Sequence, residues 1–285
     1  MSLNTTKTSK IATNLLIDEL KVDLGGRSFK NDRTTNKLIV KKKDVKFYIV
    51  PREKIVLCGI LFIKKFIKKQ FKKICIKVSF KDGDIVKPGE KIAVLYGDCK
   101  KILSVERTIL NFLQHLSAVS TTTYKLNQKI INKKTKLLDT RKTTIGLRHL
   151  EKYATRIGGA TNHRHSLNEK ILIKDNHIKV LGGIENIIKF ILKENLKRFQ
   201  IECDSITQVK RLIKIGCNDF LLDNMKVSEV KKCLKLKKNK NILFEISGGI
   251  NNKNIVQYSR LGADYISAGF ITQNPDSVDI GLDIF

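Results

Sequence analysis

Apolar residues in the first hundred positions follow two spacings, one helical and one alternating. Helical spacing covers 11–24 and 62–73, and strand-like segments cover 46–50, 74–80 and 92–96. Two turn dipeptides separate the last two strands, Asp82-Gly83 and Pro88-Gly89. We therefore predict a mixed α/β module that ends near Lys101.

The pattern changes after this module, because a long helical segment over 105–131 leads into short apolar strands that alternate with helices. The predicted strands are 136–139, 170–174, 199–203, 219–222, 242–246 and 265–267. The predicted helices are 146–156, 184–196, 206–215, 227–236 and 252–260. Such alternation predicts a parallel sheet with right-handed crossovers. An open doubly wound sheet and a closed α/β barrel both satisfy it.

The helical segment 62–73 reads FIKKFIKKQFKK and places its apolar residues on one face and lysine pairs on the other. A helix at a membrane surface or on nucleic acid has this form. A helix that packs on a sheet and exposes its lysines has it too. We favour the second interpretation, because a strand follows at once and gives the helix a core to cover.

Charge is the most unusual property of the composition, with 56 Lys and Arg against 27 Asp and Glu in 285 residues, a net charge of +29. A basic surface is typical of nucleic-acid-binding proteins. However, the excess is mostly lysine, Trp is absent, and aromatic residues make up only 7%. Proteins that recognise nucleic acid rely on arginine contacts and on stacking by aromatic side chains. We therefore expect no nucleic-acid partner and attribute most of the lysine to exposed faces.

Other compositional features exclude several classes of protein. Apolar residues make up 41%, too many for a disordered chain. No stretch approaches eighteen uncharged apolar residues, so we expect no membrane span. The N-terminal residues lack the pattern of a signal peptide, which predicts a cytoplasmic protein whose six cysteines are reduced, buried thiols.

Polar residues gather at the carboxyl end of almost every strand of the second region. They are Thr140, Arg141 and Lys142, then Lys174, Glu202, Asp223, Ser247-Gly248-Gly249 and Ala268-Gly269. The carboxyl ends of parallel strands lie at one edge of a sheet or barrel, where α/β proteins build their sites. We therefore predict one composite site.

The scarce arginines indicate what this site binds. Five of the eleven arginines fall between Arg107 and Arg164. Arg107, Arg141 and Arg164 suit bidentate recognition of a carboxylate or phosphate. Lys142, Lys174 and His163 add further donors. The predicted pocket is therefore cationic and suits a substrate with several negative charges.

The two glycine-containing turns and the two acids suggest a phosphate and a cation. Ser247-Gly248-Gly249 precedes a helix, where backbone amides bind anions, and Ala268-Gly269 supplies a second such turn. Ordinary tight turns are the alternative. Glu202 and Asp223, the only acids that we place inside the site, suit Mg²⁺ together with substrate phosphates. General acid–base roles or buried salt bridges with lysine are the alternatives for them.

Several motifs in the second half resemble those of one family, quinolinate phosphoribosyltransferase, and occur in the family's order. They include Glu106-Arg107-Thr108, Asp139-Thr140-Arg141-Lys142-Thr143, Lys152-Tyr153-Ala154, Asn162-His163-Arg164, Leu172-Ile173-Lys174-Asp175-Asn176-His177, Leu222-Asp223-Asn224 and Ser247-Gly248-Gly249-Ile250. The first hundred residues match more weakly. Departures such as Ile145, where the family usually has proline, and Ala160-Thr161 remove no expected ligand.

The resemblance implies a fold, a reaction and an assembly. The fold is α/β, an incomplete α/β barrel with an N-terminal α/β sandwich-like domain, divided into 1–105, 106–272 and a C-terminal segment 273–285 that returns to the first domain. The enzyme is a pentosyltransferase of NAD biosynthesis that joins quinolinate to phosphoribosyl pyrophosphate, giving nicotinate mononucleotide, carbon dioxide and pyrophosphate. The expected assembly is a homodimer or a higher homo-oligomer.

The resemblance also implies a role for each matching residue. Arg141, Lys142, His163 and Arg164, with Thr140, are expected to hold quinolinate, and Arg107 to complete the site from the neighbouring subunit. Lys142 and Lys174 are expected at the phosphoribosyl pyrophosphate, whose ribose and Mg²⁺-pyrophosphate Glu202 and Asp223 would anchor. Ser247, Gly248, Gly249, Ala268, Gly269 and Phe270 are expected at the 5′-phosphate. The expected catalytic residues are Lys142, Lys174, Glu202 and Asp223.

Two other functions remain possible on the sequence. One is a related phosphoribosyltransferase that uses nicotinate or another anionic ring. The other is a basic nucleic-acid-binding protein, which would bind with a steep dependence on salt.

Overall fold

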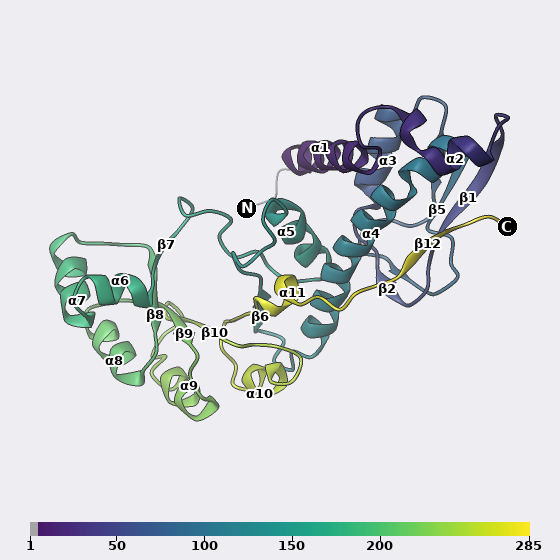
Figure 1. Cartoon of the computed structure of the whole chain (residues 1–285). Coiled ribbons are helices and arrows are strands. Elements are labelled where there is room, and N and C mark those ends of the chain that lie inside the picture. The colour runs from purple at the N-terminus through teal and green to yellow at the C-terminus, as the bar shows by residue number, and fades with distance from the viewer. Residues whose placement is uncertain (1–4) are drawn as a thin grey trace. The chain divides into compact units, whose positions relative to one another are not determined.

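The computed structural model describes residues 5–285, which form two compact units (Figure 1). The first unit contains the chain up to Tyr124 together with Ile145–Gly159 and Pro275–Phe285, and the second contains Lys125–Thr144 and Ala160–Asn274. In the described part of the chain, no helix combines the length and the apolar character needed to cross a membrane.

The first unit is built on a four-stranded antiparallel sheet in the order β12-β1-β5-β3. Its strands are β1 (Asp44–Pro51), β3 (Cys75–Val78), β5 (Ala93–Asp98) and β12 (Ile280–Asp283), and β2 (Ile55–Val56) and β4 (Ile85–Val86) form a separate pair. The helical elements are α1 (Thr5–Asp23), η1 (Phe29–Asn31), α2 (Arg33–Leu38), α3 (Ile60–Gln70), α4 (Cys99–Gln128) and α5 (Arg148–Ile157). Because β12 pairs with β1, the end of the chain lies in this first unit.

Helix α3 contains most of the FIKKFIKKQFKK segment and packs against α1 and β3. Phe62, Ile63, Phe66 and Ile67 are at most 1% exposed, whereas the lysines of the helix are exposed. The prediction that this helix covers a core is thus confirmed. Asp82 stabilises the start of α3, because its Oδ1 accepts hydrogen bonds from the backbone N–H groups of Gly59 (3.0 Å) and Ile60 (2.9 Å).

The second unit contains a six-stranded parallel sheet in the order β6-β11-β10-β9-β8-β7. The strands are β6 (Lys136–Leu138), β7 (Ile171–Ile173), β8 (Phe199–Cys203), β9 (Asp219–Asp223), β10 (Leu243–Ser247) and β11 (Tyr265–Ser267). The last strand pairs with the first, and β6 and β7 form the two edges. This is the strand order of an α/β barrel with one open seam, so the predicted fold class is confirmed.

The open seam lies beside a segment that extends the edge of β6. Thr161 pairs with β6 through Leu138, and its N–H donates to the carbonyl of Leu137 at 2.8 Å. Residues 160–164 therefore follow β6 along its free edge. This segment carries the Asn162-His163-Arg164 motif to the barrel.

Side chains alternate along the strands of the second unit between two environments. Ile201, Phe220 and Phe244 belong to the apolar core that the helices cover. Gln200, Leu221 and Glu245 face the other side, inside the barrel. The helices are α6 (Asp175–Val180), α7 (Ile184–Lys193), α8 (Ile206–Lys214), α9 (Val227–Leu234), α10 (Ile255–Ser259) and α11 (Phe270–Gln273).

Two details differ from the sequence-based expectations. Helix α4 runs without a break through residues 105 and 106, where we expected a domain boundary, and its residues up to Tyr124 belong to the first unit. The expectation of six buried cysteines was wrong for Cys75, which lies on the exposed face of β3. The other five cysteines are buried, and all six are free thiols.

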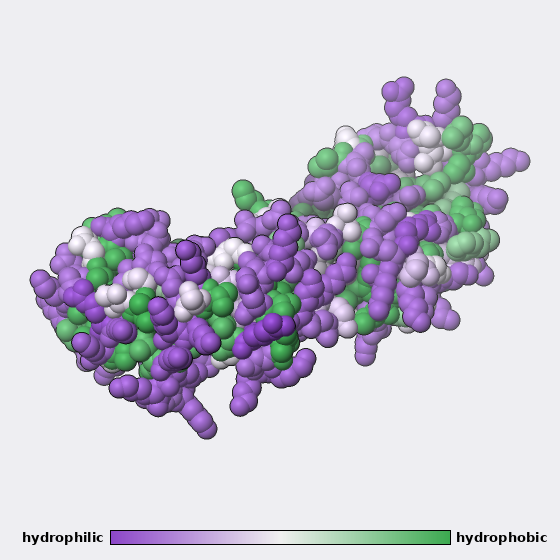
Figure 2. All heavy atoms as spheres, turned by 90° about the horizontal axis from the view of Figure 1, so that it is seen from below, coloured by the Kyte–Doolittle hydropathy of each residue, from purple (hydrophilic) through white to green (hydrophobic). Residues whose placement is uncertain are grey.

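Hydrophilic side chains dominate the face of the molecule that Figure 2 shows, which agrees with a surface rich in lysine.

Candidate active site

A cavity of about 260 Å³ lies in the second unit where the carboxyl ends of the parallel strands meet. Many of the residues predicted from sequence line it: Thr140, Arg141, Lys142, His163, Arg164, Lys174, Glu202, Asp223 and Ser247. They lie on β8, β9 and β10, in the loops directly after β6 and β7, and in the segment after Thr161. The structure therefore brings together most of the composite site predicted from the strand ends.

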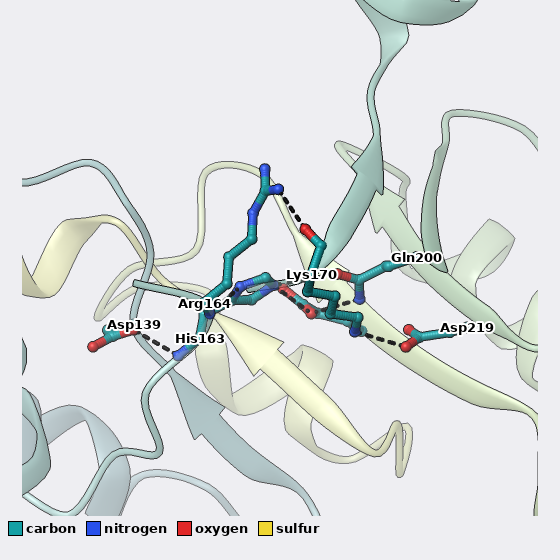
Figure 3. Close-up of polar contacts among 7 residues, drawn as sticks. Asp139, His163, Arg164, Lys170, Gln200 and Asp219 are labelled. Atoms are coloured by element: carbon teal, nitrogen blue, oxygen red, sulfur yellow. Dashed lines mark hydrogen bonds and ion pairs between the residues drawn. The ribbon is translucent and has the colours of Figure 1, made fainter. Parts of the chain in front are cut away.

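One part of the cavity wall is cationic. Burial lowers the pKa of the Arg164 guanidinium, and the positive charge of Arg141 lowers it further. The Nη1 of Arg164 donates to the carbonyl of Lys170 at 2.8 Å, which fixes the guanidinium (Figure 3). Two guanidinium groups that repel each other in a partly buried site favour an anion between them.

Another part of the wall is acidic. Burial raises the pKa of Glu202, and the negative charges of Asp223 and Asp175 raise it further, while Lys174 acts in the opposite direction. The side-chain amide of Asn224 donates to Asp223 at 2.6 Å. The cavity thus presents both cationic and anionic groups to a ligand.

Beneath these walls lies a buried polar group that includes Glu245, Gln200 and His163. The Nε2 of Gln200 donates to Oε2 of Glu245 at 2.9 Å. The Nε2 of His163 lies 3.2 Å from Oε1 of Gln200 and 3.4 Å from Oε2 of Glu245. Burial alone would raise the pKa of Glu245, but hydrogen bonds from His163 and Gln200 act in the opposite direction, and the pKa lies below its usual value.

Asp139, directly after β6, holds the segment that carries His163. This carboxylate is fully buried and accepts from the backbone N–H of His163 at 2.8 Å and from the side-chain amide of Asn162 at 2.6 Å. A buried carboxylate with several donors is a strong anchor. The position of the segment is therefore set from within the second unit.

The loop that carries Lys142 is tied to α11. The hydroxyl of Thr140 accepts from the N–H of Lys142 at 3.0 Å, and Thr272 donates to the carbonyl of Lys142 at 2.7 Å. A β-carbon added to Gly269 would lie 3.1 Å from the side chain of Lys142. The turn after β11 therefore lies directly beside the Lys142 loop.

Two family models match most of the chain. The model "Quinolinate phosphoribosyl transferase, N-terminal domain" matches residues 32–117, and that of the C-terminal domain matches residues 119–283. The chain belongs to the quinolinate phosphoribosyltransferase family. The reaction and the matching motifs inferred from the sequence therefore rest on a family match over nearly the whole chain.

Individual members of the quinolinate phosphoribosyltransferase family are similar over almost their full length. A curated protein of Methanocaldococcus jannaschii, "Probable nicotinate-nucleotide pyrophosphorylase (carboxylating)", is 36% identical, over 96% of this chain and 97% of that protein. The solved nicotinate-nucleotide pyrophosphorylase of Ehrlichia chaffeensis is 38% identical with a TM-score of 0.87, covering 95% and 98% of the two chains. That of Francisella tularensis is 34% identical with the same TM-score, covering 97% of each.

Not every residue expected from the family resemblance lies in the cavity. Among the residues that the structure describes, the cavity lining does not include Gly248, Gly249, Ala268, Gly269 and Phe270, which occupy the adjoining turns. Arg107 is an exposed residue of α4 in the first unit. The ring of His163 lines the cavity, but both of its nitrogens contact protein groups.

The sequence-based site was also incomplete. Glu202 and Asp223 were expected to be its only acids, which was wrong, because Glu245 and Asp175 line the cavity as well. Glu245 was missed because it stands between Phe244 and Ile246 in an apolar strand. A usable signal existed, since strand alternation places Glu245 on the same face as Ser247.

Proposed function

We propose that the chain transfers the phosphoribosyl group of phosphoribosyl pyrophosphate to quinolinate and releases carbon dioxide and pyrophosphate, leaving nicotinate mononucleotide. The observation that carries this proposal is the cavity in which Arg141 and Arg164 share one wall with lysines while Glu202 and Asp223 lie in the same space. Such a site suits a dicarboxylate beside a ribose phosphate. The two substrates are inferred from the family to which the chain belongs.

In this proposal the two arginines hold the quinolinate carboxylates. Arginine binds carboxylates through two parallel hydrogen bonds, which orient the ring as well as attract it. Arg164 is held by Lys170, so its guanidinium is already in place before substrate arrives. Thr140 and Lys142, on the loop after β6, complete this side of the site.

The phosphoribosyl pyrophosphate occupies the side with Lys142, Lys174, Glu202 and Asp223. The lysines face the phosphates, and the carboxylates accept hydrogen bonds from the ribose hydroxyls. The turns of Ser247-Gly248-Gly249 and Ala268-Gly269-Phe270 hold the 5′-phosphate through backbone amides. Gly248 has φ +90° and Gly249 has φ +61°, a backbone conformation that turns suited to anions use.

Glu202 and Asp223 also fit a Mg²⁺ site shared with the substrate. They offer hard oxygen ligands. Burial and then the charge of Asp223 raise the pKa of Glu202, and a divalent cation would relieve the repulsion between the two acids. No group of three or more His, Cys, Asp or Glu side chains in residues 5–285 is arranged to hold a metal. Substrate phosphates and water would therefore complete the coordination. When bound, Mg²⁺ would neutralise charge on the pyrophosphate.

The chemistry then needs little beyond orientation and charge. The ring nitrogen of quinolinate forms a bond to C1′ as the bond from C1′ to pyrophosphate breaks, and the lysines stabilise the departing charge. The carboxylates of Glu202 and Asp223 stabilise positive charge that develops on the ribose. The quaternised ring next accepts the electron pair of the bond to the carboxylate at C2, carbon dioxide leaves, and C2 takes a proton.

A homodimer in which Arg107 enters the partner subunit's site remains part of this proposal. Arg107 is exposed on α4, as such a role needs. The test mixes two inactive variants, Arg107→Ala and Lys174→Ala. If Arg107 acts across subunits, mixed dimers contain one site with both native residues, and activity returns. Mixtures that exchange subunits but stay inactive would contradict this assembly.

The decisive experiment for the reaction supplies quinolinate, phosphoribosyl pyrophosphate and Mg²⁺ and measures nicotinate mononucleotide and carbon dioxide. A parallel assay with nicotinate as sole acceptor tests the alternative phosphoribosyltransferase. Turnover of nicotinate without turnover of quinolinate would reverse our assignment. The cytoplasmic location and the absence of a nucleic-acid partner stay predictions.

A further inference from the structure

We propose that Glu245 and Gln200 position His163, and that His163 in turn positions Arg164 for quinolinate. This inference rests on the proposed function for the identity of the substrate. It concerns Glu245 and Gln200, to which the polar positions at the strand ends gave no role. It assigns the buried polar group beneath the cavity to quinolinate binding. In this role the three residues act through Arg164 and do not take part in bond breaking.

The hydrogen bonds of His163 fix where its proton lies. Its Nδ1 accepts the backbone N–H of Arg164 at 2.7 Å, so this nitrogen carries no proton. The proton of the ring is therefore on Nε2, which faces Gln200 Oε1 at 3.2 Å and Glu245 Oε2 at 3.4 Å. Both of these atoms are acceptors, so one tautomer and one ring orientation satisfy every contact.

The group is well placed to hold a fixed geometry. Gln200 and Glu245 are 1% and 2% exposed, and the side chain of His163 is 11% exposed. Oε2 of Glu245 faces the N–H groups of Gln200 at 2.9 Å and of His163 at 3.4 Å, which suits a carboxylate acceptor. Gln200 donates to Glu245 and accepts from His163 at once, which orients its amide.

Arg164 is held at two points as a result (Figure 3). Its backbone N–H donates to His163, and its guanidinium donates to the carbonyl of Lys170. Lys170 is itself anchored within the barrel, because its Nζ lies 2.7 Å from the carboxylate of Asp219. Loss of the His163 contact would free the backbone end of Arg164 while leaving the Lys170 contact.

This arrangement also alters the role expected for His163. The family resemblance placed the residue among the quinolinate ligands. To reach a substrate carboxylate through a ring nitrogen, His163 would have to release either Arg164 or the pair of Gln200 and Glu245. A positioning role needs no such change.

The kinetic test uses Glu245→Gln, which keeps the shape of the side chain and removes its charge. We expect the KM for quinolinate to rise about tenfold, the effect of one buried charged hydrogen bond on binding. The KM for phosphoribosyl pyrophosphate should stay within about twofold of wild type, a split that general misfolding would not produce. The matched control is Glu194→Gln, which removes an exposed carboxylate from the same unit.

A double variant tests whether Glu245 acts through His163. If it does, adding Glu245→Gln to His163→Gln changes the KM for quinolinate by less than about twofold, because the contact between His163 and Glu245 is already lost. Multiplicative effects of the two substitutions would overturn the inference. Equal increases in the KM values of both substrates would overturn it too.

Nitrogen-15 NMR of histidine-labelled protein supplies a test that does not need activity. The wild type should show His163 with a protonated Nε2 and an unprotonated Nδ1, assigned by comparison with His163→Gln. The opposite tautomer would refute the positioning of His163 by Glu245 and Gln200, even if the protein turns over quinolinate. The expected tautomer in a folded protein that turns over no quinolinate would support the network and refute the proposed function.

Discussion

Gly248 packs directly against Asn224, so that no side chain fits between them. A β-carbon at Gly248 would lie 2.6 Å from the backbone nitrogen of Asn224 and still closer to its side-chain amide. Gly248 also has φ +90°, which side chains disfavour. Gly249 next to it has φ +61° but open space around the same position.

We therefore expect Gly248→Ala and Gly249→Ala to differ sharply. The first must displace Asn224 and the turn, and should raise the KM for phosphoribosyl pyrophosphate at least tenfold. The second meets only a backbone cost of about 1 kcal/mol and should act as the milder control. Steady-state kinetics of the two variants, with circular dichroism to check folding, would settle the comparison. Equal effects would argue against the proposed 5′-phosphate turn.

Arg141 should be essential for quinolinate and nearly irrelevant to the fold. Burial and then the charge of Arg141 lower the pKa of Arg164, so the two groups repel until an anion binds between them. Loss of a charged hydrogen-bond donor costs about 1.5–3 kcal/mol, or roughly 10- to 150-fold in affinity. Calorimetric binding of quinolinate to Arg141→Ala measures this directly, with Arg260→Ala, an exposed arginine of the same unit, as control. Undiminished binding would refute the proposal that Arg141 and Arg164 hold the quinolinate carboxylates.

Glu202 should titrate at lower pH when Asp223 is neutral. Burial and then the charge of Asp223 raise the pKa of Glu202, so Asp223→Asn should lower it. Carbon-13 NMR of the Glu202 carboxyl without added metal measures the change, and Asp204→Asn, at an exposed position, is the control. An unchanged titration would show that the two acids are not coupled.

The same pKa shift predicts how Glu202 affects stability. Because its pKa is raised in the folded state, folded protein binds this proton more tightly than unfolded protein does. The contribution of Glu202 to the free energy of unfolding should therefore fall as pH rises from the unfolded pKa through the raised folded pKa. Glu202→Gln should flatten that part of the pH–stability curve in urea unfolding. A curve that keeps its slope would contradict the sign of the shift.

Asp82 should matter for stability through several hydrogen bonds at once. It accepts from Tyr153 at 2.7 Å and from the first N–H groups of α3. Burial raises its pKa, although these hydrogen bonds act in the opposite direction. We expect Tyr153→Phe to lower the free energy of unfolding by about 1–2 kcal/mol and Asp82→Ala by more. Urea unfolding measures both, with exposed Tyr96→Phe as the control.

The two faces of α3 should respond differently to truncation. Phe66 is fully buried, so Phe66→Ala should cost about 3–5 kcal/mol. Lys68→Ala, on the exposed face two residues later, should change stability by less than about 0.5 kcal/mol. A large effect of Lys68→Ala on stability, or a loss of nucleic-acid binding in that variant, would restore the alternative that this helix is a functional basic surface.

Long elements with clear periodicity were predictable from the sequence, and short ones were not. The strands of the parallel sheet lie within one residue of their predicted ranges, whereas α1 and α4 were found as helices but begin six residues earlier than predicted. Helix α6 was missed because six residues are too few to show a helical period. It begins at Asp175, directly after Lys174, which lines the cavity. Strand β12 has four residues, and its place follows from pairing with β1, more than two hundred residues away.

The candidate site was predictable where it follows strand ends and less so where it depends on tertiary contacts. Lys174, Glu202 and Asp223 were found because each lies near or directly after the carboxyl end of a strand. Glu245 and Gln200 lie within strands, and only pairing across the sheet shows that they face His163. Sequence position alone gives no such partner.

The open seam between β6 and β7 separates the two halves of the proposed chemistry. His163 and Arg164 reach the cavity from the segment along this free edge, whereas Glu202, Asp223 and Ser247 stand on paired strands. Part of the acceptor site, including Arg164, is therefore carried by a different stretch of backbone from the strands that bind the ribose. A designer could exchange residues 160–170 for another loop to change the acceptor ring, and leave the strands that bind the sugar untouched.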